Sequence, residues 1–279
     1  MLFYAILILS LLSGGAAAVS TGFDLLSAVL LFLGAALGSF IVFWLLAALI
    51  LWLICLPVDQ TKPQTEDSPL YRKLAAVYIS GLIRLLRIRI HTKGLEQIPT
   101  DGRFFLVSNH LFIADPAFLL HVFPRSQLSF VTKKENQKLP FVGPIMHKIL
   151  CQPIDRNNDR ASLKGILNCI KIIQEDKASV AIFPEGGTSK DGKLHHFRAG
   201  AFKIAQRTKV PVVVCTLQNT RPIFHNALRF RPTDVELHLV KVIQPEEYAG
   251  MNTVQMTDMA YEIMLEDLGD SFRTEETHT

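Results

Sequence analysis

Two long apolar runs near the N-terminus constrain the fold of this chain more than any other feature. The first extends from Met1 to Val19 and the second from Leu25 to about Val58, with a short polar turn between them. No Lys or Arg precedes Lys62. A transmembrane helix needs roughly 20 mainly apolar residues, and both runs reach or exceed that length. We therefore predict a membrane-anchoring helical hairpin over residues 1–58.

A cleaved signal peptide is the alternative interpretation of residues 1–19, because Ala16, Ala17 and Ala18 resemble a cleavage site. A signal peptide starts with positive charge, which this segment lacks, so a retained helix is favoured. Basic residues follow the second apolar run, whereas the turn between the runs has none. The positive-inside rule then predicts an integral membrane protein with residues 60–279 on the cytoplasmic face, in a bacterial cell membrane.

The chain that follows the apolar runs is strongly basic. Residues 60–246 contain 28 Lys and Arg residues against 15 Asp and Glu residues. This excess favours an anionic partner, either a phosphate-bearing substrate or an acidic lipid surface. We do not expect a nucleic-acid partner, because the sequence has no nucleic-acid-binding motif. The four cysteines lack metal or redox spacing and are expected to be buried thiols.

Residues 59–90 are predicted to form a linker and an amphipathic membrane-surface segment. The linker is polar and contains two prolines, and residues 70–90 then mix apolar and basic side chains. Such a basic amphipathic stretch beside a membrane span suits contact with anionic lipid. Packing of the same helix on its own domain is an equal alternative, and both interpretations can hold together.

Residues 91–250 alternate between strand and helix patterns. Strands are predicted at 104–108, 128–132, 179–183, 210–217 and 235–243. Helices are predicted at 116–122, 141–149, 159–174, 200–206 and 254–268. This alternation predicts an α/β fold whose mostly parallel sheet is covered by helices on both faces. Residues 251–279 are predicted to form a C-terminal helix and a disordered acidic tail.

The first chemical motif runs from Asn109-His110 to Asp115-Pro116, after a predicted strand and at the start of a predicted helix. Active sites of parallel α/β sheets lie beyond the carboxyl ends of the strands. There His110 can act as a general base, with a carboxylate fixing its tautomer. Capping of the helix is the structural alternative for Asp115. A metal pair is a further alternative, although two ligands without a third are weak support.

The second motif follows another strand and reads Phe183-Pro-Glu-Gly-Gly-Thr-Ser-Lys190. Its glycines allow backbone N–H groups to approach a phosphate. Thr188 and Ser189 add hydroxyl donors, and Lys190, Lys193 and Arg198 add positive charge. A tight glycine-containing loop without a ligand is the simpler interpretation of this motif taken alone.

Together the motifs resemble those of the glycerophospholipid acyltransferase family (PlsC-type), and most nearly its bacterial lysophosphatidate acyltransferases. The family has an NHxxxxD box, which corresponds to Asn109, His110 and Asp115, and an FPEG box, which begins here at Phe183. An Arg-containing middle segment corresponds to Pro153–Arg156. The resemblance covers about residues 82–243.

The resemblance implies a role for each matching residue. His110 would be the general base and Asp115 its partner. Arg156, Glu185 and Gly186 would hold the glycerol phosphate of the acceptor, with Asn109, Lys133, Gly187, Thr188 and Ser189 lining the substrate site. The implied reaction moves a fatty acyl group from acyl-CoA or acyl-carrier protein, as co-substrate, to lysophosphatidate. It uses no metal or other cofactor, and the implied partners are membrane lipids, the lysophospholipid acceptor and the acyl donor.

One residue departs from the family pattern. Members typically read FPEGTRS, whereas Thr188 stands here in the position of the Arg. Loss of a guanidinium weakens the grip on a phosphate by about 1–3 kcal/mol. An acyltransferase for another lysolipid acceptor is therefore one alternative function. A non-catalytic lipid-binding membrane protein and a metal-dependent hydrolase built on His110 and Asp115 are the others.

Overall fold

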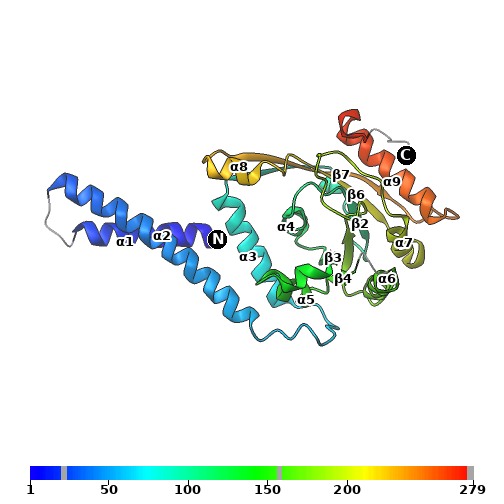
Figure 1. Cartoon of the computed structure of the whole chain (residues 1–279), viewed down its shortest axis with the longest axis horizontal. Coiled ribbons are helices and arrows are strands. Elements are labelled where there is room, and N and C mark those ends of the chain that lie inside the picture. The colour runs from blue at the N-terminus through cyan, green and yellow to red at the C-terminus, as the bar shows by residue number, and fades with distance from the viewer. Residues whose placement is uncertain (20–23, 156–158, 275–279) are drawn as a thin grey trace.

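The computed structural model describes residues 1–19, 24–155 and 159–274 (Figure 1). An apolar hairpin projects from one end of a rounded domain in which helices surround a sheet (Figure 1). The predicted disordered tail falls mostly on residues 275–279, which lie outside the described residues.

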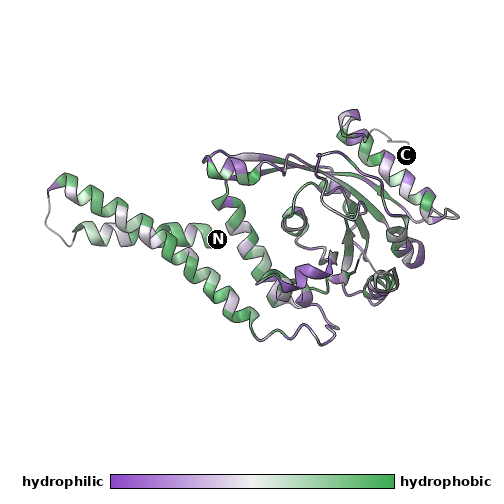
Figure 2. Cartoon of the chain, in the orientation of Figure 1, coloured by the Kyte–Doolittle hydropathy of each residue, from purple (hydrophilic) through white to green (hydrophobic). Residues whose placement is uncertain are grey.

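The hairpin consists of α1 (Leu2–Val19) and α2 (Leu25–Cys55). Asp24 begins α2, because its carboxylate accepts the N–H groups of Leu26 and Ser27 at 3.0 and 3.2 Å. Both helices are long and apolar enough to cross a membrane, and most of their surface is not covered by protein. Figure 2 shows their almost unbroken apolar colour. At 1.5 Å per residue α2 is about 46 Å long, which exceeds the roughly 30 Å hydrocarbon core of a bilayer.

Helix α3 (Pro69–Leu85) joins the hairpin to the domain. On the hairpin side, the Tyr78 hydroxyl donates to the Ala47 carbonyl at 2.7 Å, and Gly81 lies against Trp44 and Leu2. On the domain side, Ile83 belongs to the apolar core. The alternative in which this helix packs on its own protein is therefore observed, and its basic residue Arg84 remains exposed.

The sheet has seven strands in the order β1-β7-β6-β2-β5-β3-β4. All neighbouring strands are parallel except β6 and β7, which are antiparallel. The strands are β1 (Ile88–Lys93), β2 (Phe105–Ser108), β3 (Leu128–Lys133), β4 (Gln152–Ile154), β5 (Ser179–Ile182), β6 (Val212–Gln218) and β7 (Thr233–Ile243).

Helices cover both faces of the sheet, as predicted from the alternating pattern (Figure 1). One face packs against the helices α6 (Asp159–Gln174), α7 (Lys203–Thr208) and α9 (Thr253–Leu268). The other face packs against α3, α4 (Asp115–Val122), α5 (Val142–Lys148) and α8 (Ile223–Leu228). Because strand side chains alternate, Phe105 and Val107 enter the first core while Phe104 and Leu106 enter the second. The described residues also form the 3-10 turns η1 (Leu95–Gln97), η2 (Lys134–Lys138), η3 (Ala199–Phe202) and η4 (Asp270–Phe272).

The last described residues form hydrogen bonds to Leu194, in the segment that follows the Phe183 motif. The Leu194 N–H donates to the Phe272 carbonyl at 2.8 Å, and the Thr274 hydroxyl donates to the Leu194 carbonyl at 3.0 Å. Leu194 is buried and forms an isolated parallel bridge with Arg273. The segment after α9 is therefore part of the folded domain as far as Thr274.

Candidate active site

Both sequence motifs lie at the same edge of the sheet. Strands β2 and β5 are parallel neighbours, with Phe105 in register with Val180. The residues after Ser108 and after Ile182 therefore leave the sheet side by side. This edge holds the carboxyl ends of five strands, β6, β2, β5, β3 and β4, which is the usual place for a ligand in such sheets.

His110 and Asp115 form a hydrogen-bonded pair. The Nδ1 atom of His110 lies 2.9 Å from Oδ2 of Asp115. The same oxygen accepts the N–H groups of Leu111 and Phe112, each at 2.7 Å. Asp115 is fully buried and is the first residue of α4, but it bonds to the preceding loop and not to the helix's own N–H groups. The capping alternative is thus not what the structure shows.

The remaining contacts of the His110 ring leave its Nε2 atom open. The ring stacks on Phe183, with centroids 4.2 Å apart and planes inclined by 22°. Among the described residues, none hydrogen-bonds to Nε2, and 14% of the His110 side chain is exposed. Since the ionised carboxylate can only accept a hydrogen bond, Nδ1 carries the hydrogen of this pair, and a neutral ring then presents an unprotonated Nε2. That is the arrangement of a general base.

Glu185 ties the two motifs together. Its Oε1 accepts the His110 backbone N–H at 2.7 Å, and its Oε2 accepts the His195 N–H at 3.1 Å. No Lys or Arg within the described ranges forms an ion pair with it. Burial raises the pKa of Glu185 to about 7, although the two N–H groups oppose this shift. A carboxyl group that titrates near neutrality beside a general base is a feature of functional sites.

The raised pKa of Glu185 predicts a pH-dependent loss of stability. The unfolded chain ionises this group near its ordinary pKa of 4.5, whereas the folded protein holds the proton up to about pH 7. The free energy of unfolding should therefore fall by about 2–3 kcal/mol between pH 4.5 and 7 through this group. Comparing thermal unfolding of the wild type and Glu185→Gln in detergent at pH 5 and pH 8 measures this term. An equal decline in both proteins would contradict the assignment.

Asn109 holds the loop in place. Its carboxamide donates to the Leu217 carbonyl at 2.8 Å and accepts the Leu217 N–H at 2.7 Å, joining the ends of β2 and β6. The residue is only 1% exposed. These bonds position the neighbouring His110, and the predicted contact of Asn109 with the substrate stays a prediction.

Removing this carboxamide should destabilise the fold. Asn109→Ala leaves a buried N–H and a buried carbonyl of Leu217 unpaired, which should cost about 2–3 kcal/mol. A matched control is Asn168→Ala, because Asn168 is exposed on α6 and makes a single side-chain bond to Gln152. Thermal unfolding should show a clear decrease for the first variant and almost none for the control. Similar melting temperatures would show that the Leu217 bonds contribute little.

The loop after Glu185 is shaped by its own polar groups. Gly186 has φ +77°, which strains a residue with a side chain, and a Cβ atom there would lie 2.5 Å from Nε of Arg198, so the Arg198 side chain would have to move. The Ser189 hydroxyl donates to Asp191 at 2.9 Å and accepts the Gly192 N–H at 3.0 Å. Its own N–H donates to the His110 carbonyl at 2.7 Å. The buried Ser189 side chain therefore shapes the loop, and its predicted contact with the substrate stays a prediction.

Two guanidinium groups lie against this loop. Arg198 packs over Gly186, and the guanidinium of Arg221 lies over Gly192 and donates to the Lys190 carbonyl. Both side chains are exposed, and neither forms an ion pair with an acid in the described part of the chain. Sequence reasoning named Arg198 but missed Arg221. The available signal was its position three residues after the end of β6 at this edge.

The other predicted site residues fall into three groups. Gly187 and Thr188 lie in the same loop, with Thr188 exposed. Lys133 ends β3 two strands from β2, and its half-exposed ammonium group lies 3.7 Å from Glu135. Arg156 lies outside the described residues, so its predicted phosphate contact stays a prediction.

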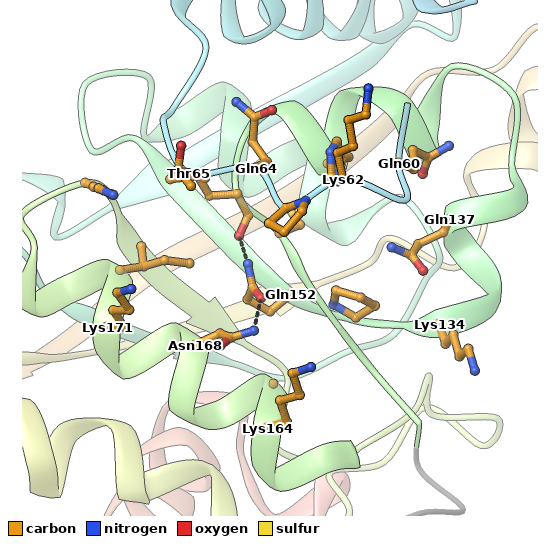
Figure 3. A pocket seen from close by; sticks show the side chains of 18 of the residues that line it. Gln60, Lys62, Gln64, Thr65, Lys134, Gln137, Gln152, Lys164, Asn168 and Lys171 are labelled. Carbon is orange, nitrogen blue, oxygen red and sulfur yellow. Dashed lines mark hydrogen bonds between the residues drawn. The ribbon is translucent and has the colours of Figure 1, made fainter. Parts of the chain in front are cut away.

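A polar pocket of about 540 Å³ lies beside the edge strand β4 (Figure 3). Lys134, Lys164 and Lys171 line it, together with linker residues 60–65. Several of its lysines are neutralised, for example Lys171 by Glu175 at 3.5 Å. His110 is not part of its lining, and β5 and β3 stand between β2 and β4. The pocket is therefore separate from the His110 centre.

Comparison with known proteins relates the chain to acyltransferases. Residues 89–218 match the family model described as Acyltransferase. A chloroplastic 1-acyl-sn-glycerol-3-phosphate acyltransferase of Brassica napus is 36% identical over 132 residues, which are 47% of this chain and 38% of that protein. A protein described as 1-acyl-sn-glycerol-3-phosphate acyltransferase from Borreliella burgdorferi is 27% identical over 172 residues, covering 60% of this chain and 68% of its own. This chain thus spans well under half of the Brassica relative.

One solved structure shares the fold. The crystal structure of the 1-acyl-sn-glycerophosphate (LPA) acyltransferase PlsC from Thermotoga maritima matches with a TM-score of 0.59. The match covers 83% of this chain and 98% of that chain, at 21% identity. At this identity the likeness establishes the fold.

Proposed function

Because residues 89–218 match the family model described as Acyltransferase, we propose that this protein transfers a fatty acyl group from a thioester donor to the free hydroxyl of lysophosphatidate. The product would be phosphatidate, a precursor of phospholipids. The His110–Asp115 pair with its open Nε2 is the observation that carries this proposal. The names of the relatives from Brassica napus and Borreliella burgdorferi, both 1-acyl-sn-glycerol-3-phosphate acyltransferases, support it.

The proposed reaction needs one base and one leaving thiolate. Nε2 of His110 takes the proton of the acceptor hydroxyl while the oxygen attacks the thioester carbonyl carbon. Asp115 holds Nδ1–H and stabilises the imidazolium that forms. The C–S bond of the tetrahedral intermediate then breaks, and the thiolate leaves with the proton from His110. Every proton and bond is accounted for by the two substrates and His110, so we propose that neither a metal nor a cofactor takes part.

The acceptor phosphate is proposed to bind at the Glu185–Gly192 loop. Arg198 and Arg221 bring two guanidinium groups to this loop, where the family's usual Arg is replaced by Thr188. Guanidinium groups bind phosphate oxygens through charge-assisted, often paired, hydrogen bonds. Arg198 and Arg221 thus offer the charge that position 188 lacks, and this supports lysophosphatidate over uncharged acceptors.

The hairpin is proposed to hold the domain at the bilayer where its lipid substrates are. Its two helices have the length and apolarity for a membrane, and the first Lys of the chain comes only after α2. By the positive-inside rule the domain would face the cytoplasm. Protease added to sealed inside-out membrane vesicles tests this, because their cytoplasmic face points outward. The domain should be digested in these vesicles and protected in right-side-out vesicles.

The test of function is a direct assay with purified full-length protein in detergent. Palmitoyl-CoA and oleoyl-lysophosphatidate are supplied, free thiol is followed, and the product is identified by mass spectrometry. Parallel reactions use acyl-carrier protein as donor, and monoacylglycerol or lysophosphatidylglycerol as acceptor. Phosphatidate formation that is insensitive to a strong chelator supports the proposal. Acylation confined to another lysolipid would replace the acceptor, and no acylation of any acceptor would support a lipid-binding protein without activity.

A further inference from the structure

We propose that α8 and the turn after it form a second membrane contact, which inserts into the headgroup region of an anionic phospholipid bilayer. Leu228 is 84% exposed and Phe230 is 83% exposed, which is unusual for two large apolar side chains so close together. Phe224 on the same helix and Ile113 in the His110 loop are 56% and 66% exposed. We call these four residues the apolar tip.

The apolar tip is held in a defined shape by contacts beneath it. Ile223 is 1% exposed and anchors α8 in the core. The Asn226 side chain donates to the Thr233 hydroxyl oxygen at 3.1 Å, and the Asn226 backbone carbonyl accepts the Arg231 N–H at 2.9 Å. Phe230 has φ +55°, a left-handed conformation that bulky residues seldom adopt. A strained backbone that displays an exposed aromatic ring points to a function for that ring.

Positive charge surrounds the apolar tip. Arg221, Arg229 and Arg231 are exposed, and no acid within the described ranges forms an ion pair with them. The nearby acid Asp234 is occupied by Arg89 at 2.7 Å and by His91 at 2.8 Å. Apolar side chains ringed by arginines match the interface of an anionic bilayer. The same ring opposes docking of a second copy, which would bring like charges together.

A series of contacts through Arg84 and Arg87 connects the apolar tip to the membrane hairpin. The Arg84 guanidinium lies over the Tyr4 ring of α1, 5.2 Å from its centre. The Arg87 N–H donates to the Arg84 carbonyl at 3.1 Å, and the Arg87 side chain donates to the Phe230 carbonyl. A short chain of contacts therefore leads from α1 to the apolar tip. Figure 1 places α8 beside the end of α3, on the side of the domain that faces the hairpin.

The proposed contact also adjoins the general base. The rings of Phe224 and Phe112 meet edge to face, with centroids 5.1 Å apart, and the Phe112 N–H donates to Asp115. Lipid that contacts α8 would thus lie one side chain away from the loop that carries His110. The inference rests on the proposed membrane anchoring by the hairpin, but it does not depend on which lipid is acylated.

The test uses full-length protein with an environment-sensitive fluorophore on a single introduced cysteine. The native cysteines are buried, so the label reacts selectively with Leu228→Cys. The matched control is Val254→Cys, because Val254 is 55% exposed at the start of α9, whose buried side chains belong to the other core. Each protein is placed as a single copy in nanodiscs of phosphatidylglycerol, with and without brominated acyl chains. If the cysteine at 228 impairs folding, Phe230→Cys replaces it.

We expect brominated lipid to quench most of the emission at position 228 and little at position 254. Adding Arg229→Glu and Arg231→Glu should reduce the quenching at 228. Equal quenching at both positions, or none at 228, overturns the proposal. If the label at position 228 stays shielded from water in the absence of lipid, and the shielding increases with protein concentration, a second copy of the chain covers the apolar tip instead. Incorporation into the discs reports on the hairpin separately, so failure of anchoring is distinguishable from failure of the α8 contact.

Discussion

Replacing His110 with alanine should lower the rate of acyl transfer by about 10²–10⁴-fold, the usual contribution of a general base. The variant keeps the loop intact, because the backbone N–H and carbonyl of residue 110 make the bonds to Glu185 and Ser189. The substitution removes Nε2 of His110, the ring nitrogen that has no hydrogen-bond partner among the described residues. The measurement is kcat with saturating palmitoyl-CoA and lysophosphatidate.

The chain offers a matched control for this experiment. His238 also contacts an aspartate, since its Nδ1 lies 3.0 Å from Oδ2 of Asp267, and it is similarly shielded with 20% of its side chain exposed. That pair joins β7 to α9, away from the loops after β2 and β5. His238→Ala should keep nearly full activity per folded molecule. A comparable loss in both variants would mean that the His110 effect reflects folding and not proton transfer.

Two substitutions of Asp115 should separate its charge from its hydrogen bonds. In Asp115→Asn the amide oxygen can take the place of Oδ2 and accept the same N–H groups, while the negative charge is lost. We expect a fall in kcat of about 10²-fold, because a neutral amide stabilises the imidazolium poorly. Stability should also fall, because the new NH2 group takes the buried place of Oδ1, which has no hydrogen-bond partner among the described residues. Asp115→Ala loses both functions, and the buried N–H groups of Leu111 and Phe112 become unpaired. It should also lose about 3 kcal/mol of stability.

The double variant tests whether His110 and Asp115 act as one unit. Residues that work together show strongly non-additive effects, so His110→Ala with Asp115→Ala should be no slower than His110→Ala alone. The rates are compared after correction for the folded fraction, measured by thermal unfolding. Fully multiplicative losses would indicate that Asp115 acts on the substrate independently of His110.

The pairing of His110 with Asp115 could be predicted because it is local. A strand end, a five-residue interval and a helix predicted to begin at Pro116 are all readable from the chain, and they bring the two side chains together. The contact between His110 and Glu185 could not be predicted from the sequence. Strand β5 comes after β3 and β4 in the sequence but lies next to β2 in the sheet, and alternation of apolar residues does not reveal strand order.

The same limit applies to other contacts at the site. Asn109 bonds to Leu217, 108 residues away, so its structural role depends on the neighbouring position of β6. Arg221 was missed for the same reason. The bonds of the Ser189 hydroxyl within its own loop were not predicted either, because a hydroxyl in a tight loop can bond to that loop or to a ligand. The antiparallel direction of β7 was not predicted either, since its alternating pattern reads the same in both directions.

The hydrogen bonds at Leu194 have a practical consequence for protein engineering. Residues Asp270 to Thr274 bond to Leu194 and thereby hold the far end of the segment that begins with Glu185. A bulky tag fused directly after Thr274, or a deletion that removes these residues, would therefore loosen a loop that touches the proposed base. Expression designs should keep residues 270–274 and add a spacer beyond them, whatever is fused there.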